Sequence, residues 1–572
     1  MDSQEQLRQL ITAQQERLGA ALPGDRQSAV IALVRARDRV QLAAEAAVSS
    51  AATGDDAGRS RLYAVGWNKA LRLCLADRAE TSGATSAPGG DRFDEWAERF
   101  IQECGRLGEA ELVLAGCETG FLQIQHGGER LFDAWVATRR MPTEWRERED
   151  FAWWAASLAR RTEREWQELA ADRPQVRQQL RALVGCGALP GDVYMTTPAL
   201  DDYYRRLGLL HARRMAHQHS YPDDAAIGGC TFGLYRDLLA RLIGWALRDL
   251  DLCVARGENE RAIRAGQGLA VPRSETALVG ALAAALNVDA ALVRRALRSL
   301  TLDRENAGYH DAPSGAAPPL IRADEDRLVW SATGLLSEPF VFLARELRRR
   351  HAQEYHNAAY LREGVFRQDL YRLFADKRFV RSVGRVELQR EGGRGGVRTD
   401  LDAVVFDRKT GTLGIFELKA QDPFARSVAE RLRQRDNFYH AGRQVAAILH
   451  WLQRHGGDAL LARVDGRTAK GFRVQKVHVF VLGRYLAHFA EGPEPDRRAA
   501  WGTWPQVLRL VDERPFGPSD ANPIRALFDK LVKDTPLNGP IGERGVREIA
   551  IGDGRVRVYP SFAAYKKGED HG

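Results

Sequence analysis

Residues 399–420 read TDLDAVVFDRKTGTLGIFELKA, and this stretch decides the fold of the C-terminal part of the chain. Apolar residues lie on both sides of a short polar segment, which predicts two antiparallel strands. The segment Asp407-Arg-Lys-Thr-Gly411 supplies turn residues, and its glycine can adopt a positive φ. The stretch therefore predicts a β-hairpin inside an apolar core.

The polar residues of this hairpin fall on one face. Side chains alternate across a strand, so Asp400 and Asp402 share a face of the first strand, and Glu417 and Lys419 share a face of the second. A four-residue loop, Arg408–Gly411, would place Asp402 opposite Glu417 and Asp400 opposite Lys419. Opposed Cβ atoms are roughly 5 Å apart, close enough for two carboxylates to share one cation.

Two carboxylates and a lysine on an apolar hairpin predict a hard-metal site. We expect Asp402 and Glu417 to bind Mg²⁺ or Mn²⁺, and Lys419 to assist the attacking water and stabilise charge on a phosphate. The alternative is a solvated face of salt-bridged charges. Lysine supplies 10 of the 84 basic residues. A lysine two residues after a strand glutamate, in a chain that otherwise uses arginine, favours the metal site.

The sequence DLDAVVFD followed by GIFELK resembles the core of the PD-(D/E)XK, or restriction-endonuclease-like, nuclease superfamily. The resemblance places Asp402, Glu417 and Lys419 at the three core positions of that superfamily, and it covers about residues 350–490. It implies an α/β nuclease fold with one or two divalent metal ions that cleaves phosphodiester bonds.

The superfamily usually has a further acidic residue on a helix before the hairpin. The matching helix is predicted over residues 361–374, and the most similar alignment puts Arg367 where a glutamate is usual. Glu363 lies one turn earlier on the same face and is the candidate replacement. Asp400 is a further candidate for the site.

A long helix, or a bent pair of helices, is predicted after the hairpin, over residues 424–454. Gln434, Arg443 and Gln444 are its candidates for facing the substrate. In some branches of the superfamily a glutamine and a tyrosine follow on this helix, but Gln434 and Tyr439 are one residue off that spacing. A further strand at 476–484 completes the predicted α/β core.

Arginines recur before the hairpin, from residue 378 to residue 398. Beside a metal site, Arg394 and Arg398 would grip phosphates and make the affinity for nucleic acid depend on salt. The alternative is a solvated hairpin in a chain that is rich in arginine.

Length and composition predict about three domains. The chain has 572 residues, a net charge of +8 and a pI near 9.2, which are compatible with a polyanionic partner. We expect a helical region at 1–270 with no assigned chemistry, a segment at 271–335 that resembles a winged helix, an α/β nuclease-like domain at 336–490 and an extension at 491–572. The predicted winged helix would contact DNA through Arg294, Arg295 and Arg298.

The N-terminal region has few chemical motifs. The segment His211-Ala-Arg-Arg-Met-Ala-His217-Gln-His219 matches no standard metal-site spacing, so we expect its histidines to cap helices or lie at the surface. The six cysteines form no C-x-x-C pair, which predicts reduced thiols in a cytoplasmic protein. No secretory signal and no run of about 18 apolar residues is apparent, so no membrane contact is expected.

Three functions agree with these patterns. The first is a metal-dependent nuclease acting on DNA, in bacterial defence or in DNA repair, with the helical half sensing a signal, recruiting a partner protein or forming a homo-oligomer. The second is a non-catalytic nucleic-acid-binding or scaffold protein with a degenerate nuclease fold, which Arg367 favours. The third is a nuclease directed at RNA, because no sequence feature separates RNA from DNA.

Overall fold

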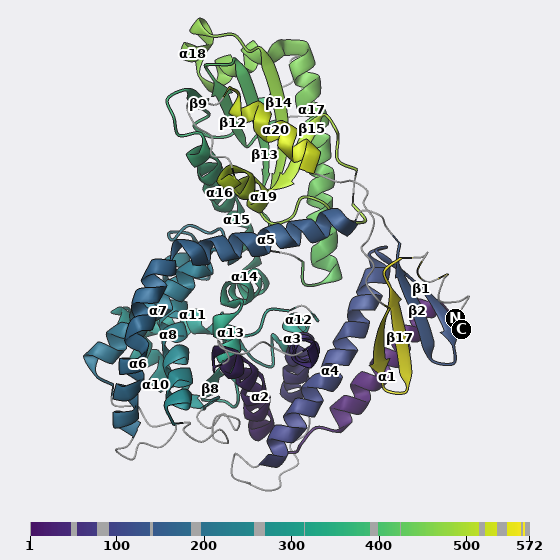
Figure 1. Cartoon of the computed structure of the whole chain (residues 1–572), viewed down its shortest axis with the longest axis vertical. Coiled ribbons are helices and arrows are strands. Elements are labelled where there is room, and N and C mark those ends of the chain that lie inside the picture. Colours follow the sequence, from purple (N-terminus) through teal and green to yellow (C-terminus); the bar gives the residue numbers. More distant parts are fainter. Residues whose placement is uncertain are drawn as a thin grey trace.

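The computed structural model covers the chain except for several segments. It describes residues 2–46, 54–76, 91–137, 141–184, 196–256, 269–313, 315–388, 399–423, 425–492, 494–513, 521–534, 546–561, 564 and 566. Figure 1 shows an α/β unit at one end of the molecule, a larger helical part at the other end and a small sheet at its side. The chain is therefore a multidomain mixture of helix and sheet, as its sequence predicts.

A five-stranded sheet forms the centre of the α/β unit, in the order β15-β14-β13-β12-β9. The strands β13, β14 and β15 are parallel, whereas β12 is antiparallel to β13 and to β9. The strands are β9 (Phe379–Arg381), β12 (Ala403–Asp407), β13 (Thr412–Lys419), β14 (Lys476–Gly483) and β15 (Ala499–Thr503).

Helices cover both faces of this sheet because its strands are apolar on both sides. Alternate residues such as Ile415 pack with Phe438 of α17, and the intervening ones such as Phe416 pack with Phe366 of α16. The covering helices are α16 (Ala359–Leu373), α17 (Val428–Val464, broken at Gly456), α18 (Gly466–Gly471), α19 (Trp504–Glu513) and α20 (Pro523–Asp534).

The predicted hairpin is confirmed, with its register. Ala403 pairs with Phe416 and Asp407 with Thr412, so the loop has four residues, 408–411. Gly411 has a φ of 64°, and a Cβ there would lie 2.6 Å from the side chain of Gln475. The buried Asp407 receives hydrogen bonds from Arg378 and from the turn. These bonds hold the pKa of Asp407 below its ordinary value, although burial alone would raise it.

Asp400 does not belong to the hairpin strand β12, which begins at Ala403, and this corrects one expectation. Asp400 lies instead on β11 (Thr399–Leu401), which pairs with β10 (Val386–Leu388), and its partner there is Glu387. Asp400 is therefore not opposite Lys419.

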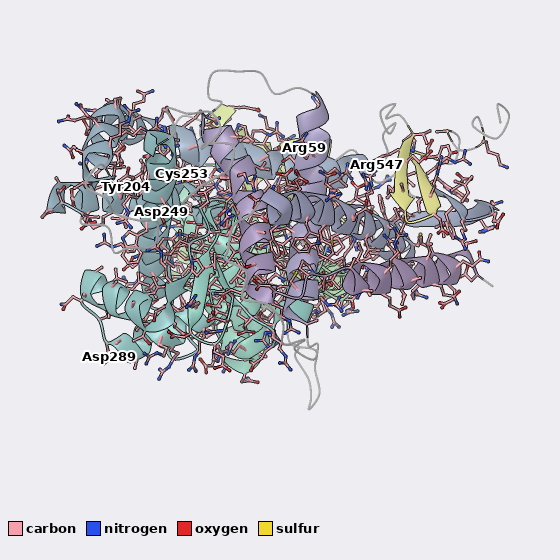
Figure 2. The ribbon with its side chains drawn as sticks, turned by 90° about the horizontal axis from the view of Figure 1, so that it is seen from below. Arg59, Tyr204, Asp249, Cys253, Asp289 and Arg547 are labelled. Atoms are coloured by element: carbon pink, nitrogen blue, oxygen red, sulfur yellow. The ribbon has the colours of Figure 1, made fainter. Side chains whose placement is uncertain are left out.

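The N-terminal region, expected to be helical, also contains strands. A hairpin, β1–β2, pairs through β2 with a C-terminal hairpin, β16–β17, and β2 and β17 are parallel. Figure 2 labels Arg547, where β16 begins beside the helical part. The elements are α1 (Ser3–Ala20), α2 (Arg26–Ala46), α3 (Gly54–Leu75), α4 (Asp91–Glu118), β1 (Leu122–Gly128), β2 (Leu131–Val136), β16 (Arg547–Ile551) and β17 (Gly554–Tyr559).

A second group of helices is centred on α8, the strongly apolar helix of the N-terminal half. A two-stranded hairpin, β3–β4, precedes α8. The elements are α5 (Met141–Arg161), α6 (Glu163–Val184), α7 (Pro198–Arg214), η1 (Ala216–Gln218), β3 (Ala226–Ile227), β4 (Cys230–Thr231) and α8 (Phe232–Arg256).

The middle segment follows the order that its sequence predicts, with two helices and then two strands around an acidic turn. Its sheet has the order β5-β8-β7-β6. The elements are β5 (Arg273–Ser274), α10 (Glu275–Leu286), α11 (Ala290–Arg298), β6 (Thr301–Leu302), α12 (Ala307–His310), β7 (Leu320–Arg322), β8 (Arg327–Trp330) and α13 (Ala332–Leu336). Helices α14 (Pro339–Arg350) and α15 (Ala352–Asn357) then lead to α16.

Two of the expected boundaries cut through packed units. A boundary at residue 490 separates β15, α19 and α20 from the sheet that they complete. A boundary at residue 270 separates α8 from α10 and α11, which share one core with it. The segment after 490 therefore belongs to two sheets rather than forming an extension.

Helix α5 joins the helical part to the α/β unit, and Figure 1 shows it crossing between them. Glu144 pairs with Arg431, and Glu147 accepts hydrogen bonds from the backbone of Ala487 and lies 2.7 Å from Nδ1 of His488. These carboxylates are buried, so the two halves meet through paired charges as well as apolar contacts.

Two further features concern the thiols and the composition of the helices. The five cysteines within the described ranges are free and buried, and Cys186 lies outside those ranges. In the described part of the chain, no single helix has the length and apolar composition needed to cross a membrane.

Candidate functional site

The polar ends of β12 and β13 open into a cleft of about 750 Å³. The carboxyl end of β13 carries Glu417 and Lys419 toward α17, because both lie on the strand face that packs under that helix. The lining residues are Glu363, Arg385, Glu387, Thr399, Asp400, Asp402, Glu417, Lys419, His440, Arg443, Gln444 and Ala447. The structure thus brings the three core candidates together in one cavity.

Asp402 and Glu417 form the floor of the cleft. Both are buried, with exposed fractions of 5% and 1%. Oδ2 of Asp402 accepts a hydrogen bond of 2.8 Å from the backbone N–H of Leu418, which fixes its carboxylate against β13. Oε2 of Glu417 is buried and accepts no hydrogen bond from any described residue. A buried carboxylate oxygen without a donor is costly, so this atom is suited to an additional cation.

Lys419 is held between two acceptors. Its Nζ donates to Oε1 of Glu417 at 2.6 Å and to Oε1 of Gln444 on α17 at 3.0 Å. Two fixed acceptors leave the third proton of the ammonium group for a ligand in the cleft. The strand and the long helix therefore position the lysine together.

Burial raises the pKa of Glu417 to about 7. The Lys419 ammonium opposes this shift, whereas the Asp402 carboxylate adds to it, because two like charges in one site repel each other. The two carboxylates therefore repel each other, and a cation bound between them would reduce that repulsion.

Glu363 lies in the cleft wall, and Arg385 links it to the floor. The Arg385 guanidinium forms an ion pair with Glu363, and its Nε lies 3.4 Å from Oδ1 of Asp402. Arg367, the residue at the usual position of the helical acid, is not among the residues that line the cleft. Glu363 therefore lines the same cleft as Asp402, with the guanidinium of Arg385 between the two carboxylates.

The other candidates divide into those inside and those outside the cleft. Asp400 and Arg443 line it. Gln434 does not, because its side chain donates a hydrogen bond of 3.0 Å to the carbonyl of Asp422 and supports the loop after β13. Arg394 and Arg398 lie outside the described residues.

Five lining residues were not among the candidates from the sequence, namely Arg385, Glu387, Thr399, His440 and Ala447. Arg385 was one arginine in an evenly spaced series, with no local signal that separates it from its neighbours. His440 lies one turn before Gln444 on α17, so the 3.6-residue period of the helix would have placed both on one face. Burial lowers the pKa of His440, and Lys419 and Arg443 lower it further.

His217 lies just after the end of α7, with Nδ1 3.1 Å from the carbonyl of Arg214, as expected of a capping residue, whereas the expectation is wrong for His211 and His219. His211 packs against Trp166, and His219 lies between Phe232 and Phe340 at ring-centroid distances of 4.7 and 4.8 Å. They are aromatic core residues.

Among the described residues, no group of three or more histidine, cysteine or acidic side chains is arranged to hold a metal ion. The cleft floor instead offers two carboxylates, Asp402 and Glu417. In comparisons with family models, curated proteins and solved structures, no match to this chain was found.

Proposed function

We propose that this protein is a metal-dependent nuclease that cleaves phosphodiester bonds in DNA at Asp402, Glu417 and Lys419. The observation that carries the proposal is the cleft floor. Two buried carboxylates lie side by side, one with an oxygen that receives no hydrogen bond from the described part of the chain, and a lysine is fixed beside them. The resemblance of this segment to the PD-(D/E)XK superfamily supports the same assignment.

The two carboxylates fit Mg²⁺ or Mn²⁺ in a site where substrate phosphates supply some of the ligands. These ions prefer carboxylate oxygens, and Mg²⁺ commonly binds to one or two protein carboxylates, with water and substrate phosphates as its other ligands. Asp402 and Glu417 would hold the ion. When bound, it would supply Lewis-acid stabilisation and an activated water. Two carboxylates are sufficient in this case, so the lack of a larger cluster among the described residues agrees with the proposal.

The chain's own residues would orient and neutralise the phosphate. Lys419 points into the cleft from its two acceptors and would stabilise charge that develops on the scissile phosphate. Arg443 is exposed at the cleft wall and would bind a neighbouring phosphate. The middle segment, whose β5-β8-β7 order and two helices resemble a winged helix, also favours a nucleic-acid partner.

The second candidate is a nucleic-acid-binding protein without catalysis. Arg385 favours it, because this guanidinium bridges Glu363 and Asp402 with no metal present. An internal cation that stabilised the site permanently would remove the need for a metal ion.

Replacing Arg385 separates these candidates. For an active metal site, we expect Arg385→Gln to tighten Mn²⁺ binding about tenfold, because it removes a competing cation beside Asp402. Isothermal titration of Mn²⁺ into protein without nucleic acid measures this change. Arg381→Gln, on the neighbouring strand, is the matched control and should leave the affinity unchanged. Absence of Mn²⁺ binding in both wild type and Arg385→Gln would favour the non-catalytic candidate.

Gln444 and Gln434 give a second contrast. Gln444→Leu removes an acceptor from Lys419, so we expect about a tenfold loss of kcat with an unchanged melting temperature. Gln434→Leu removes a buried hydrogen bond from the loop after β13, so we expect it to lower the melting temperature by several degrees and to preserve kcat. The opposite pattern would exchange the assigned roles of the two glutamines.

The deciding experiment is a cleavage assay with plasmid, linear duplex, single-stranded DNA and RNA, each with Mg²⁺, Mn²⁺ or EDTA. Metal-dependent cleavage by the wild type, lost in Lys419→Met, is the expected result. Cleavage of RNA alone would assign the RNA-directed alternative. Tight binding without cleavage of any substrate would overturn the catalytic proposal. A role in bacterial defence or repair, and recruitment of a partner through the helical half, are parts of the same proposal.

A further inference from the structure

A basic pocket lies outside the cleft. It has a volume of about 450 Å³ and is formed where α11, the β3–β4 turn and the junction of α14 with α15 meet. Its lining residues are Gly228, Gly229, Arg295, Arg298, Arg350 and His351. No acidic side chain is among these six lining residues.

The turn between β3 and β4 is packed against the cationic side chains. Gly228 and Gly229 have φ values of 66° and 68°, and a Cβ on either glycine would lie 2.6 Å from the side chain of His351 or Arg295, respectively. The backbone N–H of Gly228 donates to Glu354 at 2.6 Å. The glycines therefore let the turn form a wall of the pocket without a side chain that fills it.

The basic side chains of the pocket are only partly neutralised. Arg350 donates through Nε to Glu346, and Arg295 reaches the carbonyl of Gly229 at 3.4 Å. Neither Arg298 nor His351 makes a side-chain hydrogen bond or ion pair with another described residue, and Arg298 is exposed. Several guanidinium groups around one cavity match the oxygens of a phosphate group.

We propose that this pocket binds a backbone phosphate of the nucleic-acid strand that is cleaved in the cleft. The arrangement differs from a helix inserted into a groove. Helix α11 begins after its N-cap Asp289 at the edge of the molecule in Figure 2, but the β3–β4 turn packs against Arg295 of this helix. A helix face covered by a neighbouring turn contacts a phosphate of the backbone rather than base edges in a groove.

The pocket is close enough to the cleft for one strand to reach both. His351 begins the helical path that continues through α15 into α16, where Glu363 lines the cleft. Twelve residues of helix span at most about 20 Å. That span corresponds to about six successive phosphates of a duplex strand. The inference rests on the proposed function for the identity of the strand.

Replacing Arg298 tests the pocket. The test uses full-length protein carrying Glu417→Gln, which prevents cleavage. In this background we expect Arg298→Ala to weaken the binding of a 20-nucleotide DNA (the 20-mer) about tenfold at 0.1 M salt. The slope of log K against log salt should fall by about one. Arg294→Ala is the matched control, since Arg294 is exposed on the same helix but does not line the pocket. Its effect should be under twofold. An equal loss of affinity in the two variants, or no loss in either, would overturn the assignment of this pocket to a backbone phosphate.

A small substrate separates this inference from the proposed function. Hydrolysis of bis(p-nitrophenyl) phosphate with Mn²⁺ needs only the cleft, so Arg298→Ala should leave its kcat unchanged. With the 20-mer, the same variant should raise KM. Failure to hydrolyse either substrate would count against the cleft assignment, while the binding result would still decide the pocket.

A free phosphate compound is the other source of the same chemistry. Titration with inorganic phosphate and with a mononucleotide distinguishes it. Sub-millimolar binding of either compound, lost in Arg298→Ala while binding of the 20-mer is retained, would assign the pocket to a small ligand and overturn the strand proposal.

Discussion

Glu417→Gln is expected to abolish metal-dependent cleavage, by 10³-fold or more, while leaving the protein folded and slightly more stable. The substitution keeps the shape of the side chain but removes one of the two carboxylate charges that would hold the metal. A loss of this size corresponds to about 4 kcal/mol of transition-state stabilisation.

The expected gain in stability of Glu417→Gln follows from the raised pKa of Glu417. The pKa of Glu417 in the folded protein is raised to about 7 from an ordinary value of 4.5. Above pH 7 this carboxylate is ionised in both the folded and the unfolded chain, and its burial then destabilises the folded one. Removing the charge at pH 8 should therefore increase the free energy of unfolding by about 1–2 kcal/mol.

Asp407 on the same hairpin is the matched control. It is buried and held by Arg378, so Asp407→Asn leaves Arg378 without its charged partner. We expect a loss of about 3 kcal/mol of stability with kcat retained in the folded fraction. Chemical denaturation and cleavage kinetics on both variants measure the two effects. Full activity in Glu417→Gln would remove the site assignment.

The helical part is expected to unfold between pH 6 and pH 4.5, before the pH reaches the range in which most carboxylates titrate. Burial lowers the pKa of three core histidines, to about 4 for His211, about 3 for His219 and about 4 for His310. In the unfolded chain they titrate near 6.5, so the unfolded state binds more protons as the pH falls below that value.

Each such histidine removes about 1.4 kcal/mol of stability per pH unit below 6.5. Three together remove roughly 8 kcal/mol by pH 4.5, which is comparable to the whole stability of a domain. Buried carboxyls with raised pKa values, such as Asp38 and Glu147, oppose this loss because they gain a proton in the folded state.

His219→Phe tests the assignment, because the side chain already lies between two phenylalanines. It should shift the midpoint of acid unfolding, followed by circular dichroism, to lower pH. His356→Phe, at an exposed position of α15, is the control and should leave the midpoint unchanged. An equal midpoint in wild type and His219→Phe would show that this histidine does not govern the transition.

The parts of the fold that depend on local sequence could be predicted. The register of the β12–β13 hairpin follows from the alternation of its apolar residues and from the turn at 408–411, so Asp402 and Glu417 were assigned to one face correctly. Helix α16 also lies where the spacing of Phe366 and Leu370 places it.

Features that depend on distant contacts could not be predicted. Asp400 continues the same alternation as Asp402, but its strand pairs with β10, which no local pattern indicates. Gln434 and Gln444 both lie on α17, and the hydrogen bond of Gln434 to the Asp422 carbonyl depends on where the loop after β13 lies. The domain boundaries were wrong for the same reason, because the last strands join sheets that begin far earlier in the chain.

The pairing of β2 with β17 has a consequence for biosynthesis. Arg557 reaches back across 424 positions to bind Asp133 with two hydrogen bonds, of 2.7 and 2.9 Å. At roughly 5–20 residues per second, a ribosome needs about 20–80 s to make the chain between these partners. The edge of β2 in the N-terminal hairpin therefore stays unpaired until β17 has been made. A message cut short before codon 554 would yield a protein that lacks β17, and the exposed edge of β2 would make it a target for proteolysis.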